Sequence, residues 1–260
     1  TYYNTVVSAV NSTYFSKNSS YDATADHNKL DDNIQLSVGQ NLTSCGWILD
    51  TANTIYTLQN NLSATGDCLV VQANNITIDL NGYNITGDDS GVEDYGIDVT
   101  GYNSTTIMNG GIYDFEYGIY FYDNSNNNIT NITANSNHAG IIFFLSSNNT
   151  LTNITANNNG AGISFFSSSN NTLTNITTNN NADTGVSLSS SSNNTLQNIR
   201  ANNNSYGIYL SSGSDNNNLT DVIANNNSYG IYLVSNSKNN YLIDGNYSGN
   251  TNKDVYLASI

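Results

Sequence analysis

The sequence predicts an all-β protein, a parallel β-solenoid of roughly ten stacked coils, each coil 22–23 residues long. Three observations predict this fold: a Gly-Ile/Val step that recurs at a fixed period, apolar columns in phase with it, and no helical spacing inside the repeats. The step recurs at Gly96-Ile97, Gly118-Ile119, Gly140-Ile141, Gly162-Ile163, Gly185-Val186, Gly207-Ile208 and Gly230-Ile231.

Each repeat consists of short alternating segments. In residues 150–156 apolar residues alternate with Thr, as a half-buried strand requires, and clusters of Asn, Gly and Ser separate such segments because these residues favour turns. We expect two or three strands of about three to five residues per coil, each paired with its equivalent in the next coil. An amide column predicts a hydrogen-bonded ladder along the axis; it comprises Asn109, Asn131, Asn153, Asn175 and Asn198, followed by Asp221 and Asp244.

The two ends of the chain differ from the repeats. Residues 1–40 lack the repeat, and the β-helix is expected over residues 41–260. Tyr3, Val7, Val10 and Tyr14 have the spacing of one amphipathic helix, which we expect to be a cap over the first coil or a docking segment for a neighbouring subunit. Residues 254–257 read as one more coil without a cap, and an uncapped coil exposes strand edges that can pair with another chain.

Composition excludes two classes of partner. Five basic residues against 20 carboxylates give a net charge of −15, so the chain lacks the basic face that nucleic acid requires. No run of 18 apolar residues exists to span a membrane. Asn alone accounts for 52 of the 260 residues, so the polarity of this chain comes from amides rather than charges.

The two cysteines, Cys45 and Cys68, are 23 residues apart, one coil period. Residues one period apart lie on adjacent coils at a Cα separation that suits a disulfide, whereas a metal pair would need further Cys or His ligands. A disulfide implies an oxidising compartment, and we expect an extracellular, cell-surface location.

Eighteen Asn-X-Ser/Thr sequons accompany the cysteines. N-linked glycans are therefore the expected addition to a secreted chain, and no cofactor is expected. Asn residues in the ladder are unsuitable acceptors, so the expected sites lie elsewhere, mostly at turns. They are Asn11, Asn18, Asn41, Asn61, Asn103, Asn148, Asn170, Asn193, Asn203, Asn226 and Asn246.

The segments 45–58, 68–70 and 75–87 resemble the opening of right-handed parallel β-helix proteins of the pectate-lyase-like superfamily. The Asn-Asn-Thr-Leu-Thr-Asn-Ile and Tyr-Gly-Ile-Tyr-Leu repeats resemble its NosD-like branch, which is abundant in archaeal surface proteins. The resemblance covers about residues 42–257 and implies a single-stranded right-handed β-helix. It implies no single activity, because the superfamily holds lyases, hydrolases, adhesins, copper-accessory proteins and surface-layer components.

Residues that carry catalytic chemistry are few. Gly87-Asp88-Asp89 resembles the paired-Asp motif of polygalacturonases, but Gly-His-Gly and Arg-Ile-Lys are missing, and His138 stands in His-Ala-Gly. Arg200 is alone in its column, and His27 and Met108 have no partners nearby for a copper site. We therefore expect no catalytic residues and no metal centre beyond weak Ca²⁺ affinity in an acidic loop formed by Asp88, Asp89, Glu93 and Asp94.

One column of aromatic residues is expected on the outside of the solenoid. Tyr120, Tyr209, Tyr232 and Tyr256 occupy the position after Gly-Ile/Val, which points outward if Ile points inward. Such a stripe can stack on sugars or pack in an interface, and Tyr is also simply a favourable outward strand residue. These alternatives stay open at the level of sequence.

Three functional hypotheses follow. The first is a secreted structural protein that assembles with itself into a sheath, surface layer or filament through its coil ends and N-terminal segment. The second is a polysaccharide-binding or polysaccharide-degrading module, and the third is metal delivery of the NosD type.

Overall fold

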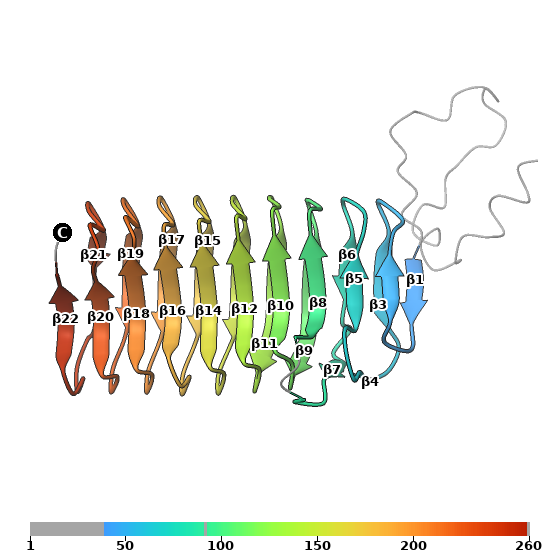
Figure 1. The fold of residues 1–260 in the computed structure, drawn as a ribbon, viewed down its shortest axis with the longest axis horizontal. Helices are drawn as coiled ribbons and strands as arrows, with labels where there is room; N and C mark the ends of the chain where they lie inside the picture. The colour runs from blue at the N-terminus through green and yellow to red at the C-terminus, as the bar shows by residue number, and fades with distance from the viewer. Residues whose placement is uncertain (1–38, 91–92, 259–260) are drawn as a thin grey trace, which may run out of the picture. The chain divides into compact units, whose positions relative to one another are not determined.

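A computed structural model describes residues 39–90 and 93–258, which form 22 strands. The strands stack as successive coils along one axis (Figure 1). The first seven strands are short: β1 (Gly39–Leu42), β2 (Trp47–Leu49), β3 (Ile55–Leu58), β4 (Leu62–Ser63), β5 (Leu69–Val71), β6 (Thr77–Asp79) and β7 (Asn84–Thr86).

The strands from Tyr95 onward alternate between the two sides of the coil. On one side are β9 (Thr106–Tyr113), β11 (Asn128–Asn135), β13 (Thr150–Thr155), β15 (Thr172–Thr177), β17 (Thr195–Arg200), β19 (Asn218–Ile223) and β21 (Tyr241–Ile243). On the other are β8 (Tyr95–Thr100), β10 (Tyr117–Tyr122), β12 (Ala139–Phe144), β14 (Ala161–Phe166), β16 (Thr184–Ser189), β18 (Tyr206–Ser211), β20 (Tyr229–Leu233) and β22 (Lys253–Leu257).

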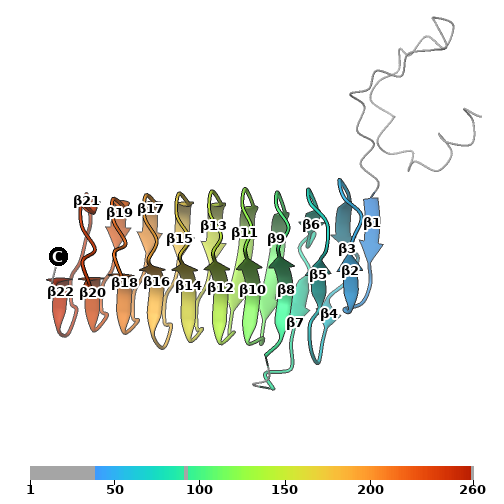
Figure 2. The ribbon, with the colours of Figure 1, turned by 45° about the horizontal axis from the view of Figure 1, so that its top comes forward.

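Two parallel sheets run the length of the stack, one on each side of the coils (Figures 1 and 2). Sheet A contains β1, β3, β6, β9 and every second strand from there to β21, with β4 and β7 beside them; sheet B contains β2, β5, β8 and every second strand to β22. Between β8 and β21 the register joins residues 22 or 23 apart, for example Leu151 with Leu173 and Ile163 with Val186. Several pairings of the coils before β8 depart from this period, with Leu69 opposite Ile97 and Thr77 opposite Thr106. The predicted all-β solenoid of about ten coils is therefore confirmed, and no helix occurs in the residues described.

The expected strand length was wrong for most coils. From Tyr95 onward each coil holds two strands, most of them six residues long, rather than two or three strands of three to five. The reason is visible in β11, which runs through Asn131 although this residue has a φ of 54°. The segments on both sides of that corner pair with the same neighbouring coil, so two short strands merge into one.

A narrow apolar core fills the space between the sheets. The columns Ile107–Ile129–Leu151–Leu173 in sheet A and Ile119–Ile141–Ile163–Val186 in sheet B are fully buried. Phe121, Phe143 and Phe165 stack in the same core with ring centroids 4.6 and 4.7 Å apart. Each buried aliphatic side chain contributes about 1.5–3 kcal/mol relative to exposure, and the column repeats this contribution in every coil.

Four left-handed corners close each coil between β9 and β19 and explain much of the Asn content. In the coil after β11 these corners lie at Asn131, Ser136, Leu145 and Asn148, all with φ between 52° and 60°. Left-handed backbone is costly for most residues and cheapest for Gly, Asn and Asp. The equivalent corners of the next coil are Asn153, Asn158, Ser167 and Asn170, so Asn recurs at the coil period because the backbone needs it.

Two ladders of buried Asn side chains satisfy the backbone at the turns. In the first, each Asn carbonyl oxygen accepts the backbone N–H of the previous coil's Asn, as between Asn149 and Asn171 (2.9 Å) and between Asn171 and Asn194 (2.8 Å). The second ladder runs through Asn137, Asn159, Asn181, Asn204 and Asn227 with bonds of 2.8–2.9 Å. A Ser column at Ser146, Ser168, Ser191 and Ser214 does the same at a third turn.

The predicted amide column lies on the outside of sheet A and is also hydrogen-bonded. Each side-chain amide donates to the previous coil, from Asn198 to Asn175 (2.7 Å) and onward through Asn153 and Asn131 to Asn109 (3.0–3.1 Å). Asn109 donates in turn to the carboxylate of Asp79 (3.1 Å). The donors all point toward the N-terminal coils, so the side-chain oxygen of Asn198 faces Asp221, which has no proton donor to offer when ionised.

Cys45 and Cys68 form the predicted disulfide, with Cα atoms 4.3 Å apart. They precede β2 and β5, whose residues Trp47 and Leu69 are register partners. The bond therefore links two neighbouring coils at the first turns of the described stack. The helix expected over Tyr3–Tyr14, and the cap or docking role of residues 1–40, lie outside the described residues apart from Gly39 and Gln40.

Candidate functional site: the outer face of sheet B

The Gly-Ile/Val step determines which side chains face outward from sheet B. A Cβ placed on Gly162 would lie 2.5 Å from the carbonyl oxygen of Gly185, inside the coil, so this position excludes any other residue. Because the glycine and the following Ile both face inward, the residues on either side of the pair both face outward. A Tyr-Gly-Ile-Tyr segment therefore presents two tyrosines to the outside from the same strand.

The first group of outward tyrosines, the β8–β10 tyrosine cluster, comprises Tyr95, Tyr117, Tyr120 and Tyr122. The ring of Tyr120 lies 5.1 Å from that of Tyr95 and 5.5 Å from that of Tyr117. Tyr95 and Tyr117 are stacked at 5.4 Å. These distances are those of favourable aromatic pairs, so the four rings form one continuous, partly exposed surface.

The second group, the β18–β22 tyrosine cluster, comprises Tyr206, Tyr209, Tyr229, Tyr232 and Tyr256. Tyr232 is its centre, with ring centroids 4.7–5.5 Å from the other four. Tyr209, Tyr232 and Tyr256 stack directly over one another because they are register partners in adjacent coils. Stacked rings have few rotamers left to lose, so this surface is organised before any ligand binds.

The surroundings raise the pKa of a central phenol in each cluster. Burial raises the pKa of Tyr232, and the neighbouring tyrosines raise it further. The pKa of Tyr120 is raised for the same reasons, with Asp98 and Glu93 adding to the effect. Tyr95 has a raised pKa because of burial and because its hydroxyl donates a 2.6 Å hydrogen bond to Glu93. Tyr95, Tyr120 and Tyr232 therefore present uncharged rings with hydroxyl groups at their edges.

Further aromatic residues extend the first cluster along the axis. Tyr122, Phe144 and Phe166 are register partners, with ring centroids 5.6 and 6.1 Å apart. Phe144 and Phe166 are 38% and 37% exposed, which is high for Phe in a folded protein. In β16 the positions that align with the outward tyrosines hold small, uncharged residues: Thr184 and Ser187 are buried, at 5% and 7% exposure, and Ser189 is partly exposed. β18 then begins the second cluster.

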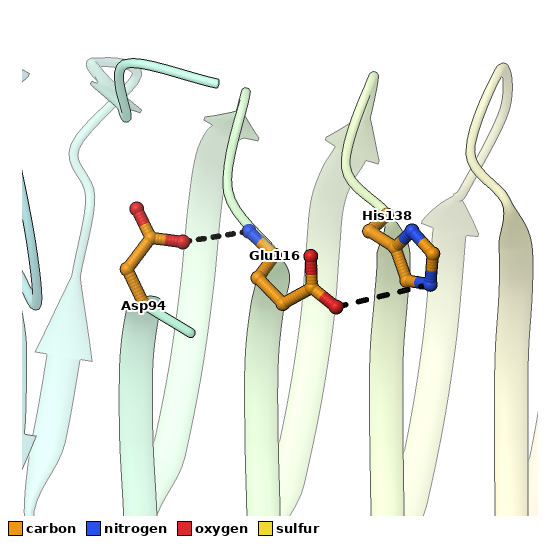
Figure 3. Close-up of polar contacts among 3 residues, drawn as sticks. All are labelled: Asp94, Glu116 and His138. Carbon is orange, nitrogen blue, oxygen red and sulfur yellow. Dashed lines mark hydrogen bonds and ion pairs between the residues drawn. The ribbon is translucent and has the colours of Figure 1, made fainter. Parts of the chain in front are cut away.

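A polar hollow lies at the turn that leads into sheet B, next to the first cluster. Its volume is about 330 Å³, and its lining includes Asp89, Asp114, Glu116 and His138, which we call the acidic corner. Glu116 and His138 begin successive coils of sheet B with Glu116 Oε1 3.8 Å from His138 Nε2, and Asp94 Oδ1 accepts the backbone N–H of Glu116 at 2.7 Å (Figure 3). Burial, and then the charge of Asp89, raises the pKa of Asp114.

The acidic corner combines a carboxyl group with a raised pKa, further carboxyl groups and an imidazole. Groups of this kind can exchange protons with a bound molecule. Sequence reasoning found Asp89 and His138 but not their proximity, and it missed Asp114 and Glu116. The coil period could have predicted that Glu116 and His138 are neighbours, because they are 22 residues apart.

The weak Ca²⁺ affinity expected of the acidic loop stays a prediction, and three of its carboxylates make hydrogen bonds within the chain. Asp88 accepts the backbone N–H of Ser90, Glu93 bonds Tyr95, and Asp94 is buried with one oxygen bonded to Glu116. Within residues 39–90 and 93–258 no three His, Cys, Asp or Glu side chains lie close enough together to hold a metal ion. His27 lies outside the described residues, and Arg200 is exposed on β17 of sheet A, away from the acidic corner.

Five of the nine expected glycan sites that lie in the described residues are at exposed left-handed corners. The described residues of this kind are Asn148, Asn170, Asn193, Asn203 and Asn226. Asn41, Asn61 and Asn246 are also exposed, whereas Asn103 is half-buried and accepts a hydrogen bond from Ser125. Asn11 and Asn18 lie outside the described residues.

The sequence identified four of the outward tyrosines and missed five. Tyr120, Tyr209, Tyr232 and Tyr256 lie on the outer face, as expected from their position after Gly-Ile/Val. The missed residues are Tyr95, Tyr117, Tyr122, Tyr206 and Tyr229. For four of them the signal was the Tyr before the glycine, whose outward direction follows only once the glycine is known to face inward. Tyr122 instead lies two residues after Tyr120 on the same strand.

The coil geometry and the aromatic outer face together define a parallel β-helix protein. Residues 95–247 match the family model described as the right-handed β-helix region, which is more than half of the chain. The chain therefore belongs to the right-handed β-helix family, with the fold of the pectate-lyase-like superfamily. No curated protein sequence matches it.

Solved structures share this fold at low sequence identity. Pectate lyase Pel9A is 15% identical with a TM-score of 0.57, covering 80% of this chain and 70% of its own. A mutant of the periplasmic alginate epimerase AlgG is 16% identical with a TM-score of 0.57, covering 80% and 60%. The enzymatically active domain of tailspike protein 2 from bacteriophage CBA120 is 14% identical with a TM-score of 0.54, covering 79% and 42%.

Identities in this range establish the fold and not the activity. The NosD-like assignment of the repeats stays a prediction. In the described part of the chain, no helix is long and apolar enough to cross a membrane.

Proposed function

We propose that this protein is a polysaccharide-binding β-helix module that holds its ligand on the outer face of sheet B. The observation that carries the proposal is the pair of preformed tyrosine clusters on that face. Sugar rings present C–H faces that pack on aromatic rings, and phenol hydroxyls can bond the sugar hydroxyls at the rim. The similar folds of a pectate lyase, an alginate epimerase and a phage tailspike support a polysaccharide ligand as well.

The charge of the face favours an uncharged polysaccharide over an acidic one. Asp98 lies in the same outward column as Tyr120, and Glu93 is bonded to Tyr95. Lys253 is the only basic residue in the strands of sheet B, and the whole chain carries −15. A polyanion approaching this surface meets repulsion with almost no compensating cation.

Binding is tested by native gel electrophoresis with soluble polysaccharides in the gel matrix. The wild-type protein should be retarded by at least one uncharged polysaccharide and not by polygalacturonate or alginate. Tyr232→Ser should weaken retardation about tenfold, equivalent to about 1.4 kcal/mol. Serine is suited to this position because Ser187 and Ser164 occupy the same column in β16 and β14.

The matched control is Tyr241→Ser, because Tyr241 is the more exposed residue, at 61%, but lies on sheet A. Its retardation should equal that of the wild type. Equal loss in both variants, or no retardation by any uncharged polysaccharide, would reject the proposal.

A degrading activity would use the acidic corner. Assays for reducing-sugar release and for unsaturated products on the bound polysaccharide decide this point. If turnover occurs, Asp114→Asn should abolish it while retardation in the gel persists, because Asp114 is outside the tyrosine clusters. Turnover unaffected by Asp114→Asn and Glu116→Gln would assign the chemistry elsewhere.

Self-assembly into a sheath, layer or filament is a second candidate. Its support is the exposed apolar row Tyr122, Phe144, Leu145 and Phe166 along one edge of sheet B, which can pack against another copy. The route expected through the coil ends and residues 1–40 stays a prediction, because residues 1–38 lie outside the described part of the chain. Sedimentation over a concentration series tests self-assembly. The mass of the particle should increase with protein concentration in the wild type and should not increase in Phe144→Ser.

We also propose that the protein is extracellular and glycosylated. The disulfide between Cys45 and Cys68 supports an oxidising compartment, and the exposed corner Asn residues offer accessible acceptors. Mass spectrometry of the native protein, before and after enzymatic removal of N-linked glycans, tests both the presence and the positions of the glycans.

A further inference from the structure

The two tyrosine clusters lie on one face, in one register. The outward column runs Tyr120, Ile142, Ser164, Ser187, Tyr209 through consecutive strands β10 to β18. Four inter-strand steps separate the two tyrosines, which corresponds to ~19 Å at ~4.8 Å per step. Both clusters therefore face the same direction at a fixed separation on a rigid support.

The surface between the clusters does not obstruct an extended ligand. The other outward column between them holds Ala139, Ala161 and Thr184. These side chains are small and uncharged, and Ala139 and Thr184 are buried. Ile142 is the one larger side chain between the clusters in these two columns, so a chain lying on the tyrosines meets no charged group from either column. At the side, Phe144 and Phe166 continue the aromatic surface to β14, which leaves β16 as the one strand of sheet B between β8 and β22 without an outward aromatic residue.

From this arrangement we infer that the two clusters are subsites for one polysaccharide chain, which lies along the coil axis and contacts both at once. This inference rests on the proposed function and specifies the ligand: an extended, uncharged polymer longer than the separation between the clusters. Oligosaccharides too short to span that separation bind either cluster alone.

The consequence is a length threshold in affinity. Once a ligand bound at one cluster can reach the other, the second contact becomes intramolecular and its effective concentration is in the millimolar range. Affinity then rises by a factor of about 10²–10⁴ without any new type of contact. Two unrelated sites would instead give a gradual rise with length, as the number of binding frames increases.

The test is calorimetric titration with size-graded oligosaccharides of the polysaccharide that retards the protein. Three proteins are compared: the wild type, Tyr120→Ser and Tyr232→Ser, each variant lacking the central ring of one cluster. Tyr241→Ser on sheet A is the control. Melting temperature verifies that each variant is folded, and Tyr120→Phe and Tyr232→Phe provide variants that keep the stacked rings if a serine variant is unstable.

The inference predicts an affinity jump of at least tenfold at a defined length in the wild type and the control. Both serine variants should lose the jump and keep measurable binding of short oligosaccharides at the intact cluster. If the stacked rings carry the contact, the Phe variants keep the jump.

Two results would overturn the inference. Binding of oligosaccharides without a threshold, or a threshold that survives in one of the serine variants, shows that the clusters act separately, and the proposed function stands without the bridging chain. Absence of binding at every length, by the polymer as well, rejects the proposed function itself.

Discussion

Replacement of Asn171 by Ala should destabilise the protein strongly. Asn171 is 1% exposed, and its side-chain oxygen accepts two hydrogen bonds from Asn149, one from the backbone N–H at 2.9 Å and one from the side-chain amide at 3.0 Å. Its amide donates to Ser168 O and to Asn194. The substitution leaves two buried donors of Asn149 without an acceptor. Each unsatisfied buried donor costs about 1–3 kcal/mol, so we expect a loss of about 2–4 kcal/mol in the free energy of unfolding.

The assay is equilibrium urea unfolding, followed by far-ultraviolet circular dichroism and by tyrosine fluorescence. Coincident transitions in the two signals are required before a free energy is taken, because stacked repeats can unfold in parts. The control is Asn128→Ala, at an exposed residue whose side chain makes no hydrogen bond within the described part of the chain. It should change stability by less than about 0.5 kcal/mol. Equal stability of the two variants would refute the role assigned to the buried ladder.

Three further substitutions test other features of the coils. Asp221→Asn should raise the urea midpoint, because its amide can donate to the side-chain oxygen of Asn198 and extend the outer ladder, worth about 0.5 kcal/mol at an exposed site; a lower midpoint would contradict the inferred ladder direction. Leu145→Asn should raise the melting temperature, because Leu145 is 45% exposed with a φ of 52° and relief of left-handed strain is worth about 1 kcal/mol. An unchanged melting temperature would show that the backbone at Leu145 is not strained. Asp98 has a pKa raised by burial, although Thr100 partly opposes this. The folded state therefore holds this proton more tightly than the unfolded state, and the contribution to stability is present below the ordinary aspartate pKa and lost as pH rises through the folded pKa. Asp98→Asn should remove that loss. If the free energy of unfolding differs between acidic and neutral pH by the same amount in the variant as in the wild type, the role assigned to Asp98 is disproved.

The coil period was predictable because the backbone imposes it on many residue types at once. The glycine inside each coil, the apolar columns and the outer Asn ladder each recur every 22 or 23 residues, and register partners in a parallel sheet must then coincide. The disulfide followed from the same period. The outward tyrosine column at Tyr120, Tyr209, Tyr232 and Tyr256 followed from alternation after the Gly-Ile/Val step.

The buried Asn ladders were not predicted, although their columns are as regular as the others. Asn171 and Asn181 occur in runs of two or three Asn residues. Composition alone predicts that such runs are solvent-exposed turns. Their burial depends on the direction of each side chain at a corner, which the left-handed neighbours Asn170 and Asn180 determine. The acidic corner was missed for a related reason: Asp89 and Asp114 meet only because a loop leaves the regular period there.

The most direct test of the central claim, that tyrosines on sheet B hold an uncharged polysaccharide, is nuclear magnetic resonance of protein labelled at its tyrosine rings. On titration with the polysaccharide, signals of the two clusters should shift, while those of the buried Tyr56 and of Tyr241 on sheet A should stay in place. Shifts confined to tyrosines outside the clusters, or no shifts under conditions where binding is measured, would contradict the account.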